Sequence, residues 1–313
     1  MDIQTAISKC LNDLSLAQNT VRNYTSGLRR FAEFLTEQNL PPTAPLENLT
    51  IENFIAFMPW LDKLYAKQTA HMYNTAAGAF LNFLVIEGAL QIDYVDGIRY
   101  KLASLRSTRR RQEKLPRWPK KDDVSKMQKA VREYTEESPR KERNIALIEF
   151  LASSGCRISE IIALNIQDID LMKCSAIVMG KGSKERRVFF SQAASDALRN
   201  YWSARKSGQA TDPVFARHDR GAGHKRIKRM TTNTARNIVK NIAGIAGIDP
   251  TKFSPHYFRH AFAIRVLSET GNLALTQDLL GHTDPKSTRN YAKIEAEDLQ
   301  KAHAAIFNHI QKE

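Results

Sequence analysis

Residues 175–191 read SAIVMGKGSKERRVFFS, and this stretch departs from the helical spacing on either side of it. Two short apolar runs, SAIVMG and RRVFFS, flank KGSKE, which has the composition of a hairpin tip. Short runs of this kind extend from Ile166 to Phe190. The pattern predicts one small antiparallel sheet in a mainly α-helical chain, with Lys181 and Lys184 at the hairpin tip.

Helical spacing surrounds the predicted sheet on both sides. Residues Arg140 to Ser153 have the pattern of an amphipathic helix, and Gly155 follows as a stop signal. After the sheet, we expect helices to begin at about Ala193, Thr231, Pro255, Leu273, Pro285 and Ala296. Residues 296–310 carry apolar side chains on one face and predict an amphipathic tail helix. This helix either packs on its own domain or docks on a neighbouring protomer.

The first hundred residues predict a separate helical bundle of four or five helices. Thr20 is the expected N-cap of one helix, and Thr50 is the expected N-cap of a second, short helix. A third helix is expected from Lys67 to Glu87, with Gly88 as its stop.

Residues 105–119, LRSTRRRQEKLPRWP, lack apolar periodicity and end with two prolines. Such a segment is typical of a linker. We therefore predict a helical domain at 1–104, a basic linker at 105–119 and a second domain at 120–313.

The charge of the chain indicates a polyanionic partner. The 313 residues carry a net charge of +14, with 42% hydrophobic residues, as in ordinary globular proteins. Between Arg99 and Lys121 the sequence has ten Lys or Arg residues and one acidic residue, and a second basic cluster spans Arg217 to Arg229. A generally basic surface is the alternative, but clustering favours binding to a phosphate backbone. The candidate contacts are Arg109, Arg110, Arg111, Arg117, Lys225, Arg226, Lys228 and Arg229.

The remaining composition argues for a cytoplasmic protein. The three cysteines are irregularly spaced, which disfavours a disulfide framework or a zinc knuckle. No secretory leader or long apolar segment is evident, so we expect no membrane span.

The heptapeptide SPHYFRH at 254–260 predicts an anion site at a helix start. Ser254 suits the N-cap and Pro255 the first helical position, which places His256 in the first turn. Arg259 lies three residues later on the same face, so both side chains can hold one phosphate. The alternative is that His256 packs and Arg259 forms a surface ion pair. His256 and His260 have zinc-site spacing, but a cation at Arg259 and the lack of a nearby carboxylate argue against metal.

Two further segments carry candidate site residues. Arg157 follows Gly155 and has Glu160 as a possible ion-pair partner three residues away. Gly281 is expected in the left-handed conformation at a helix end, with His282 in the turn and Tyr291 about two turns into the next helix. Each residue alone has an ordinary structural alternative.

Taken together, these residues resemble the tyrosine recombinase family, also called the phage integrase or Xer-like family. The matched pattern is Arg157, Lys181 in a hairpin, His256 with Arg259 in H-x-x-R, Gly281-His282, and Tyr291 nine residues after that histidine. The motif match covers about residues 116–295, and the N-terminal bundle matches in organisation only. The implied fold is mainly α with a small antiparallel β-sheet. It forms a two-domain clamp of a helical core-binding (SAM-like) domain and an α+β catalytic domain.

The resemblance implies site-specific cutting and rejoining of duplex DNA through a 3′-phosphotyrosyl intermediate on Tyr291. It implies no cofactor, neither metal nor ATP, because the ester stores the bond energy. Arg157, Arg259 and His282 would stabilise the phosphate, Lys181 would be the general acid, and His256 the base, with the two histidine roles interchangeable. The implied partners are a specific recombination site and a homo- or heterotetramer on paired sites.

Three other functions share some of these features. A type IB topoisomerase or telomere resolvase shares the chemistry. A non-catalytic DNA-binding regulator would have lost site residues, and none is missing here. A metal-dependent nuclease would need clustered carboxylates, which the sequence lacks.

Overall fold

The chain forms two compact units, Met1–Leu115 and Pro116–Glu313, in a computed structural model. The structure describes residues 1–13, 18–105, 120, 122–180, 185–205, 208–218, 227–251 and 253–281. Most of the predicted linker and the predicted helices beyond Gly281 lie outside the described residues. The division between the units falls at 115–116, within the segment predicted as the linker.

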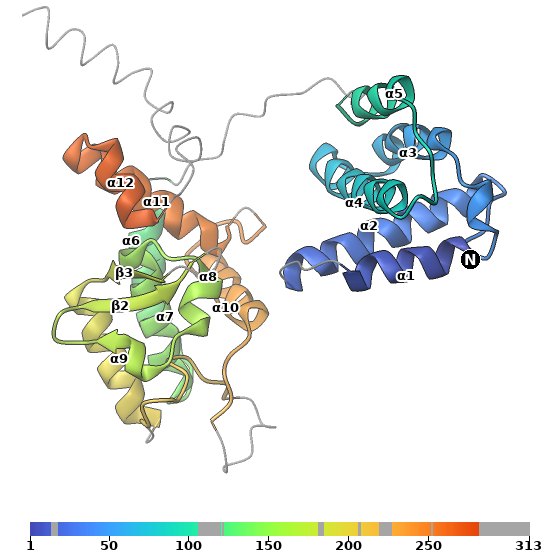
Figure 1. The fold of residues 1–313 in the computed structure, drawn as a ribbon. Coiled ribbons are helices and arrows are strands. Elements are labelled where there is room, and N and C mark those ends of the chain that lie inside the picture. The colour runs from blue at the N-terminus through green and yellow to red at the C-terminus, as the bar shows by residue number, and fades with distance from the viewer. Residues whose placement is uncertain are drawn as a thin grey trace, which may run out of the picture. The chain divides into compact units, whose positions relative to one another are not determined.

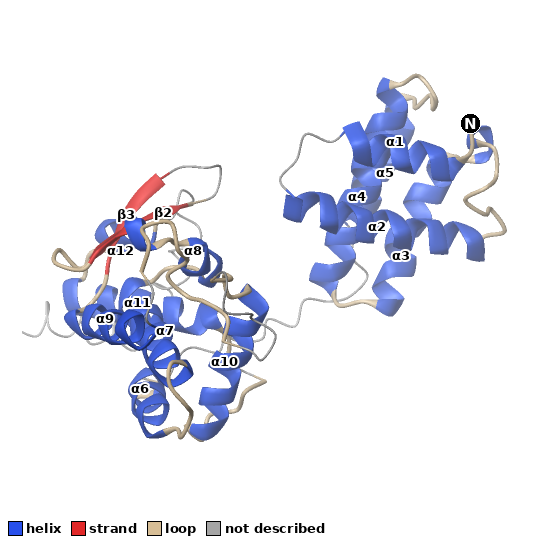
Figure 2. Cartoon of the chain, turned by 90° about the horizontal axis from the view of Figure 1, so that it is seen from below, coloured by secondary structure: helices blue, strands red, loops and turns tan. Residues whose placement is uncertain are grey.

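The described part of the first unit contains helices and loops, without a strand (Figure 2). Its helices are α1 (Ile3–Asp13), α2 (Gln18–Glu37), α3 (Ile51–Leu64), α4 (Lys67–Ile86) and α5 (Tyr94–Leu105). Five helices agree with the predicted bundle. At the start of α3, the Thr50 N–H donates to Asn53 Oδ1 at 2.9 Å, as expected of the N-terminal boundary. The prediction for α2 was wrong at its start, because the helix begins at Gln18 and Thr20 lies inside it.

Aromatic side chains make the core of the first unit. Phe31 of α2 contacts Phe54 and Phe57 of α3 and Phe80 of α4, with ring centroids 4.7, 5.0 and 6.4 Å away. All four rings are buried. The helical spacing of these residues therefore directs one face of each helix into a common core.

The second unit surrounds one central helix with helices and a sheet (Figure 1). Its helices are α6 (Asp123–Glu133), α7 (Arg140–Ser154), α8 (Ile158–Ala163), α9 (Gln192–Arg205), α10 (Thr232–Ile245), α11 (Pro255–Thr270) and α12 (Leu273–Leu280). The strands are β1 (Ile169–Asp170), β2 (Ser175–Met179) and β3 (Glu185–Phe189) in the order β1-β2-β3, all antiparallel. The predicted hairpin is confirmed, although its tip at 181–184 is not among the described residues.

Helix α7 differs from the amphipathic helix that its sequence predicts. Residues Ala146 to Leu151 are buried without interruption. Helices α6, α9 and α11 and strand β3 all contact α7, so neighbouring elements cover its whole circumference. The helix ends as predicted at Gly155, which has φ +63°. Helices α6 and α8 had no counterpart in the sequence prediction, and α8 is too short to show a periodic pattern.

Candidate active site

The first part of the site is the turn between α7 and α8. Gly155 reverses the chain in the left-handed conformation, and Arg157 occupies the N-cap position of α8. The Arg157 N–H donates to Glu160 Oε2 at 2.8 Å, and its Nη1 donates to Glu160 Oε1 at 2.8 Å. The predicted ion pair is therefore present. The side chain of Arg157 remains 34% exposed, which leaves part of the guanidinium facing solvent.

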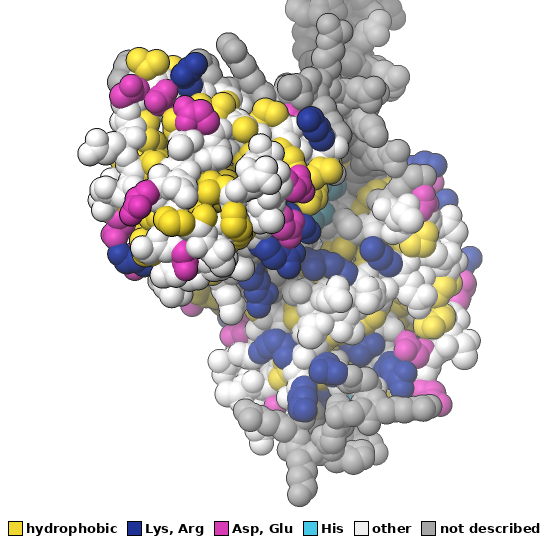
Figure 3. All heavy atoms as spheres, turned by 90° about the vertical axis from the view of Figure 1, so that its right-hand side faces the viewer, with side chains coloured by type: hydrophobic (Ala, Val, Ile, Leu, Met, Phe, Trp, Pro, Cys, Tyr) yellow, Lys and Arg dark blue, Asp and Glu magenta, His cyan; other side chains and the backbone are white. Residues whose placement is uncertain are grey.

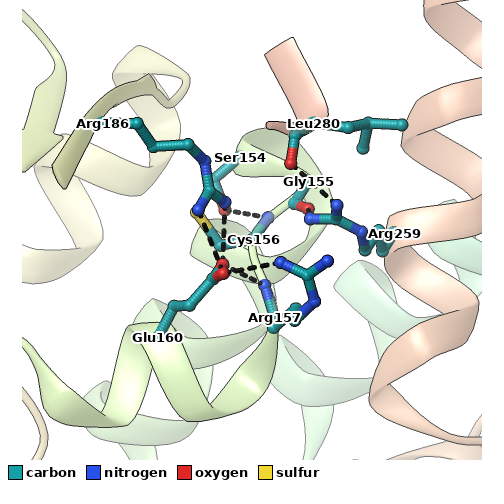
Figure 4. A network of polar contacts seen from close by, with 8 residues as sticks. All are labelled: Ser154, Gly155, Cys156, Arg157, Glu160, Arg186, Arg259 and Leu280. Carbon is teal, nitrogen blue, oxygen red and sulfur yellow. Dashed lines mark hydrogen bonds and ion pairs between the residues drawn. The ribbon is translucent and has the colours of Figure 1, made fainter. Parts of the chain in front are cut away.

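Glu160 is shared with a second arginine from the hairpin. Arg186 of β3 donates from Nη1 to Glu160 Oε1 at 3.0 Å and from Nη2 to Oε2 at 2.8 Å (Figure 4). Burial would raise the pKa of Glu160, but the hydrogen bonds and charge of Arg186, with those of Arg157, lower it below 4.5. The carboxylate is thus ionised at neutral pH. The stability that this pairing adds is lost only as the pH falls below 4.5 through the lowered pKa.

Among the predicted site residues that the structure describes, Arg259 is the most deeply buried. It is 3% exposed, and its guanidinium lies between the ends of two helices (Figure 4). Nη1 donates to Gly155 O at 2.6 Å, and Nη2 donates to Leu280 O at 2.7 Å. The C-terminal carbonyls of a helix carry partial negative charge, so a buried cation is stabilised there. Arg259 therefore joins the end of α7, which precedes Arg157, to the end of α12, which precedes His282.

His256 lies in the first turn of α11 as predicted, with Ser254 at the N-cap and Pro255 at the first helical position. The residue keeps contact with solvent, although part of it is buried. This partial burial and the charges of Arg259, Arg157 and Arg236 lower the pKa of His256 below 6.5. The imidazole is therefore neutral at pH 7 and able to accept a proton. Since three arginines act on this ring, Arg157, Arg259 and His256 share one electrostatic site.

A second phenol lies next to His256 in the chain. Tyr257 donates its hydroxyl proton to Asp123 Oδ2 and accepts a hydrogen bond from the Lys120 N–H at 2.9 Å. Burial and the hydrogen bond to Asp123 raise the pKa of Tyr257 to about 12. A phenol with a raised pKa is a poor nucleophile, so Tyr257 is unsuited to attack a phosphate.

Several predicted residues lie outside the described part of the chain. They are Lys181, His282 and Tyr291 of the catalytic set and Arg109, Arg110, Arg111, Arg117, Lys225 and Arg226 of the basic set. Of the catalytic set, the structure describes Arg157, His256 and Arg259, and the charges of the two arginines act on His256.

Two predicted DNA contacts are described, and both lie at the surface. Lys228 is exposed. Arg229 donates from Nη1 to the carbonyls of Ile162 and Leu164 at 2.6 and 2.8 Å, and from Nη2 to Asn165 Oδ1 at 2.5 Å. Arg229 thus holds the end of α8. Lys and Arg side chains also gather on the visible face of the second unit, the lower body in Figure 3.

Sequence reasoning missed two arginines of the site. Arg236 of α10 acts on His256 through its charge, and Arg186 of β3 binds Glu160. Arg186 stands only two residues after the KGSK tip, in which only lysines were considered. Its inward orientation depends on strand register, with Arg186 opposite Val178.

The described residues contain no candidate metal site. Among these residues, no three His, Cys, Asp or Glu side chains gather closely enough to hold a metal ion. The helices within these ranges are also too short or too polar to cross a membrane.

The fold and the cluster of arginine and histidine side chains point to one class of protein, the tyrosine recombinases. The model of the phage integrase family matches residues 117–298. The chain is 30% identical over 300 residues to a protein named tyrosine recombinase XerC from Pediococcus pentosaceus, covering 93% of this chain and 92% of the relative. It is 28% identical over 292 residues to tyrosine recombinase XerD from Vibrio cholerae, covering 92% and 90%. The chain belongs to the phage integrase family.

Solved structures support the fold independently. The XerH site-specific recombinase bound to palindromic difH substrate has a TM-score of 0.70 at 20% identity, over 96% of this chain and 88% of that chain. A λ integrase dimer bound to a core site has a TM-score of 0.66 at 16% identity, over 93% and 95%. The mainly helical fold with a small antiparallel sheet and two domains is therefore that of this class.

Proposed function

We propose that the protein is a site-specific recombinase that cuts and rejoins duplex DNA through a 3′-phosphotyrosyl intermediate on Tyr291. The observation that carries this proposal is the hydrogen bond from Arg259 to Gly155 O, which ties the H-x-x-R segment to the turn of Arg157 although 104 residues separate the two partners. Relatives named tyrosine recombinases over nine-tenths of their length give further support.

The chemistry assigns one task to each group. The Tyr291 oxygen attacks phosphorus, the bond from phosphorus to the 5′ oxygen breaks, and negative charge grows on the non-bridging oxygens. Arg157 and Arg259, with His282, stabilise that charge. His256 takes the phenolic proton because its lowered pKa keeps it neutral, and Lys181 donates a proton to the departing 5′ oxygen. The free 5′ hydroxyl, or one from a partner duplex, then attacks the phosphotyrosine and releases Tyr291.

The proposed substrate is double-stranded DNA that carries a specific recombination site. In this proposal 1–104 is the core-binding domain, 105–119 the basic linker along the backbone and 120–313 the catalytic domain. Two duplexes present four strands and each protomer supplies one tyrosine, so a tetramer on paired sites is the natural assembly. We place this reaction in the cytoplasm.

The test is trapping of a covalent adduct. The substrate is a DNA site nicked close to the cleavage position, so that the short strand with its 5′ hydroxyl diffuses away, and EDTA is present throughout. The unmodified protein should form an adduct that survives denaturing electrophoresis, and Tyr291→Phe should bind the same DNA without forming it. Tyr257→Phe is the matched control and should retain the adduct, because the pKa of that phenol is raised.

An adduct that persists in Tyr291→Phe would place the nucleophile elsewhere. An adduct that requires divalent metal would contradict the mechanism. Arg157→Ala should leave DNA affinity nearly intact and slow cleavage by about 100- to 1000-fold, because one oxyanion donor is lost.

A further inference from the structure

The phenol of Tyr257 ties the start of α11 to the start of α6. Its hydroxyl donates to Asp123 Oδ2 and accepts from the Lys120 N–H at 2.9 Å. These two partners belong to one turn, because the Asp123 N–H donates to Lys120 O at 3.1 Å. With its pKa raised to about 12, Tyr257 keeps its proton at neutral pH and remains the donor. One side chain thereby joins segments that lie 134 residues apart in the chain.

Both members of this contact are held in place by their surroundings. Asp123 is the first residue of α6 and is 6% exposed. The Tyr257 ring packs against Phe253 with the ring centroids 4.2 Å apart, and Phe253 belongs to the buried core of the second unit. Loss of a buried hydrogen bond leaves a polar group without a partner, which is costly. The contact therefore restrains the first turn of α11.

Helix α6 is in turn fixed to α7, the helix that ends just before Arg157. Glu149 of α7 is buried and accepts two hydrogen bonds from α6. Gln128 donates from Nε2 to Glu149 Oε2 at 2.7 Å, and Arg132 donates from Nη2 to Glu149 Oε1 at 2.5 Å. The contact at Tyr257 thus connects the first turn of α11 to the same framework that carries Arg157.

His256 lies in this first turn, next to Tyr257, but points in another direction. His256 is exposed and Tyr257 is half-buried, and successive side chains of a helix point about 100° apart. The Tyr257 N–H also donates to Ser254 O at 2.8 Å, which closes the turn around His256. Movement of the turn would carry the imidazole away from the arginines that act on it. The contact with Asp123 opposes such movement on the side of α6.

We propose that Asp123 and Tyr257 form a positioning pair that holds His256 in place to take the proton of the attacking phenol. The inference rests on the proposed function, because it requires His256 to act as the base. Neither member of the pair touches the phosphate or the reacting atoms in this scheme. Their effect reaches the reaction through the first turn of α11.

The first experiment measures single-turnover cleavage of the nicked site by Asp123→Ala, with Asp122→Ala as the matched control. Asp123→Ala should slow cleavage by about 10- to 100-fold, since a misplacement of about 1 Å can cost about 100-fold in rate. Asp122 is exposed and makes no side-chain hydrogen bond at the start of α6, so Asp122→Ala should cleave like the unmodified protein. Cleavage by Asp123→Ala at the unmodified rate would overturn the proposal.

The second experiment tests whether the two residues act through one contact. Tyr257→Phe removes the hydroxyl and keeps the ring, so its cleavage rate should fall as far as that of Asp123→Ala. The adduct should still accumulate in Tyr257→Phe, because Tyr291 is intact. The double variant should be no slower than the slower single variant, because two residues of one hydrogen bond are not additive. Additive losses in the double variant would overturn the proposal.

The third experiment separates positioning of His256 from a general effect on folding. His256→Gln should itself slow cleavage by about 100-fold or more, the contribution typical of a general base. In this background Asp123→Ala should cause no further loss, because no base remains to be positioned. A purely structural role would slow cleavage by the same factor in both backgrounds, and that result would overturn the proposal.

A conservative variant tests the hydrogen bond itself. Asp123→Asn keeps an oxygen that can accept from the Tyr257 hydroxyl, so it should cleave faster than Asp123→Ala. Equal rates for the two variants would contradict the role of this hydrogen bond. Failure of the unmodified protein to form an adduct would count against the proposed function, whereas a cleavage rate insensitive to Asp123 would count against the positioning pair alone.

Discussion

At the scale of single residues, the site is governed by positive charge held close to a histidine. Arg259 is fixed by two helix-terminal carbonyls, and Arg157 is fixed by Glu160. Partial burial makes protonation of His256 unfavourable, and these fixed cations add to the effect. The same cations would attract a phosphate, so they favour both phosphate binding and a neutral histidine.

The pKa of His256 should therefore respond to Arg236. In Arg236→Gln one cation is removed, and the pKa of His256 should rise toward 6.5. Because the pKa of His256 is lower in the folded chain, the unfolded chain binds more protons at this residue. The free energy of unfolding therefore decreases as the pH falls below 6.5, and this decrease should be smaller in Arg236→Gln. NMR titration of the imidazole in DNA-free protein, assigned with His256→Gln, measures the shift.

Arg265→Gln is the matched control for that titration. Arg265 is exposed on the same helix, and its charge is not a cause of the His256 shift. The His256 titration should be the same as in the unmodified protein. A pKa in Arg236→Gln that equals the unmodified value would show that Arg236 has no effect on this ring.

At the scale of elements, the site is assembled from the ends of helices. The ends of α7 and α12 provide carbonyls to Arg259, and the start of α11 carries His256. Glycines allow these ends to approach. Gly155 and Gly281 both have φ +63°, and a Cβ atom on Gly155 would lie 2.6 Å from the Phe262 ring.

Replacement of Gly281 by alanine should be more damaging than a change of backbone preference alone. The left-handed conformation costs a non-glycine residue about 1–2 kcal/mol, and the new methyl group would also collide with Arg186. Gly271→Ala is the matched control, because Gly271 caps α11 at φ +62° with no atom within 4 Å of its Cβ position. Chemical denaturation should show a loss of about 1–2 kcal/mol for Gly271→Ala and a larger loss for Gly281→Ala. Equal losses would mean that Arg186 yields to the methyl group without cost.

At the scale of the whole molecule, two units with separate cores are joined through a segment of high positive charge. One core contains residues between Ile3 and Leu84, and the other contains residues between Met127 and Phe258. The segment from Arg99 to Lys121 carries ten basic residues against one acid. A charge density of this kind predicts contact with phosphates.

Removal of linker charge should weaken DNA binding in a salt-dependent way. In the triple variant Arg109→Ala, Arg110→Ala, Arg111→Ala, the slope of log K against log salt should fall by up to about 2.7, or about 0.9 for each lost phosphate contact. The control Lys126→Ala, Lys129→Ala, Lys173→Ala loses the same charge from exposed positions outside both basic clusters. Its slope should change little. An unchanged slope in the linker variant would show that these arginines do not contact DNA.

The sequence alone determined the local structure and the kinds of groups in the site. The start of α3 after Thr50, the start of α11 at Pro255, the stop at Gly281 and the hairpin all follow from signals within a few residues. Backbone preferences and capping act over such short spans, so these features could be predicted.

Only the tertiary structure decided which of these groups meet and what state they are in. In the folded chain Arg186 binds Glu160, neighbouring elements surround α7, and the pKa of His256 is lowered. Desolvation and Coulomb interaction depend on distance in space, and residues far apart in the chain supply both. For that reason the local pattern predicted an amphipathic α7 and singled out only the lysines of the hairpin. In the folded chain α7 is buried on all sides, and Arg186 of the hairpin points inward.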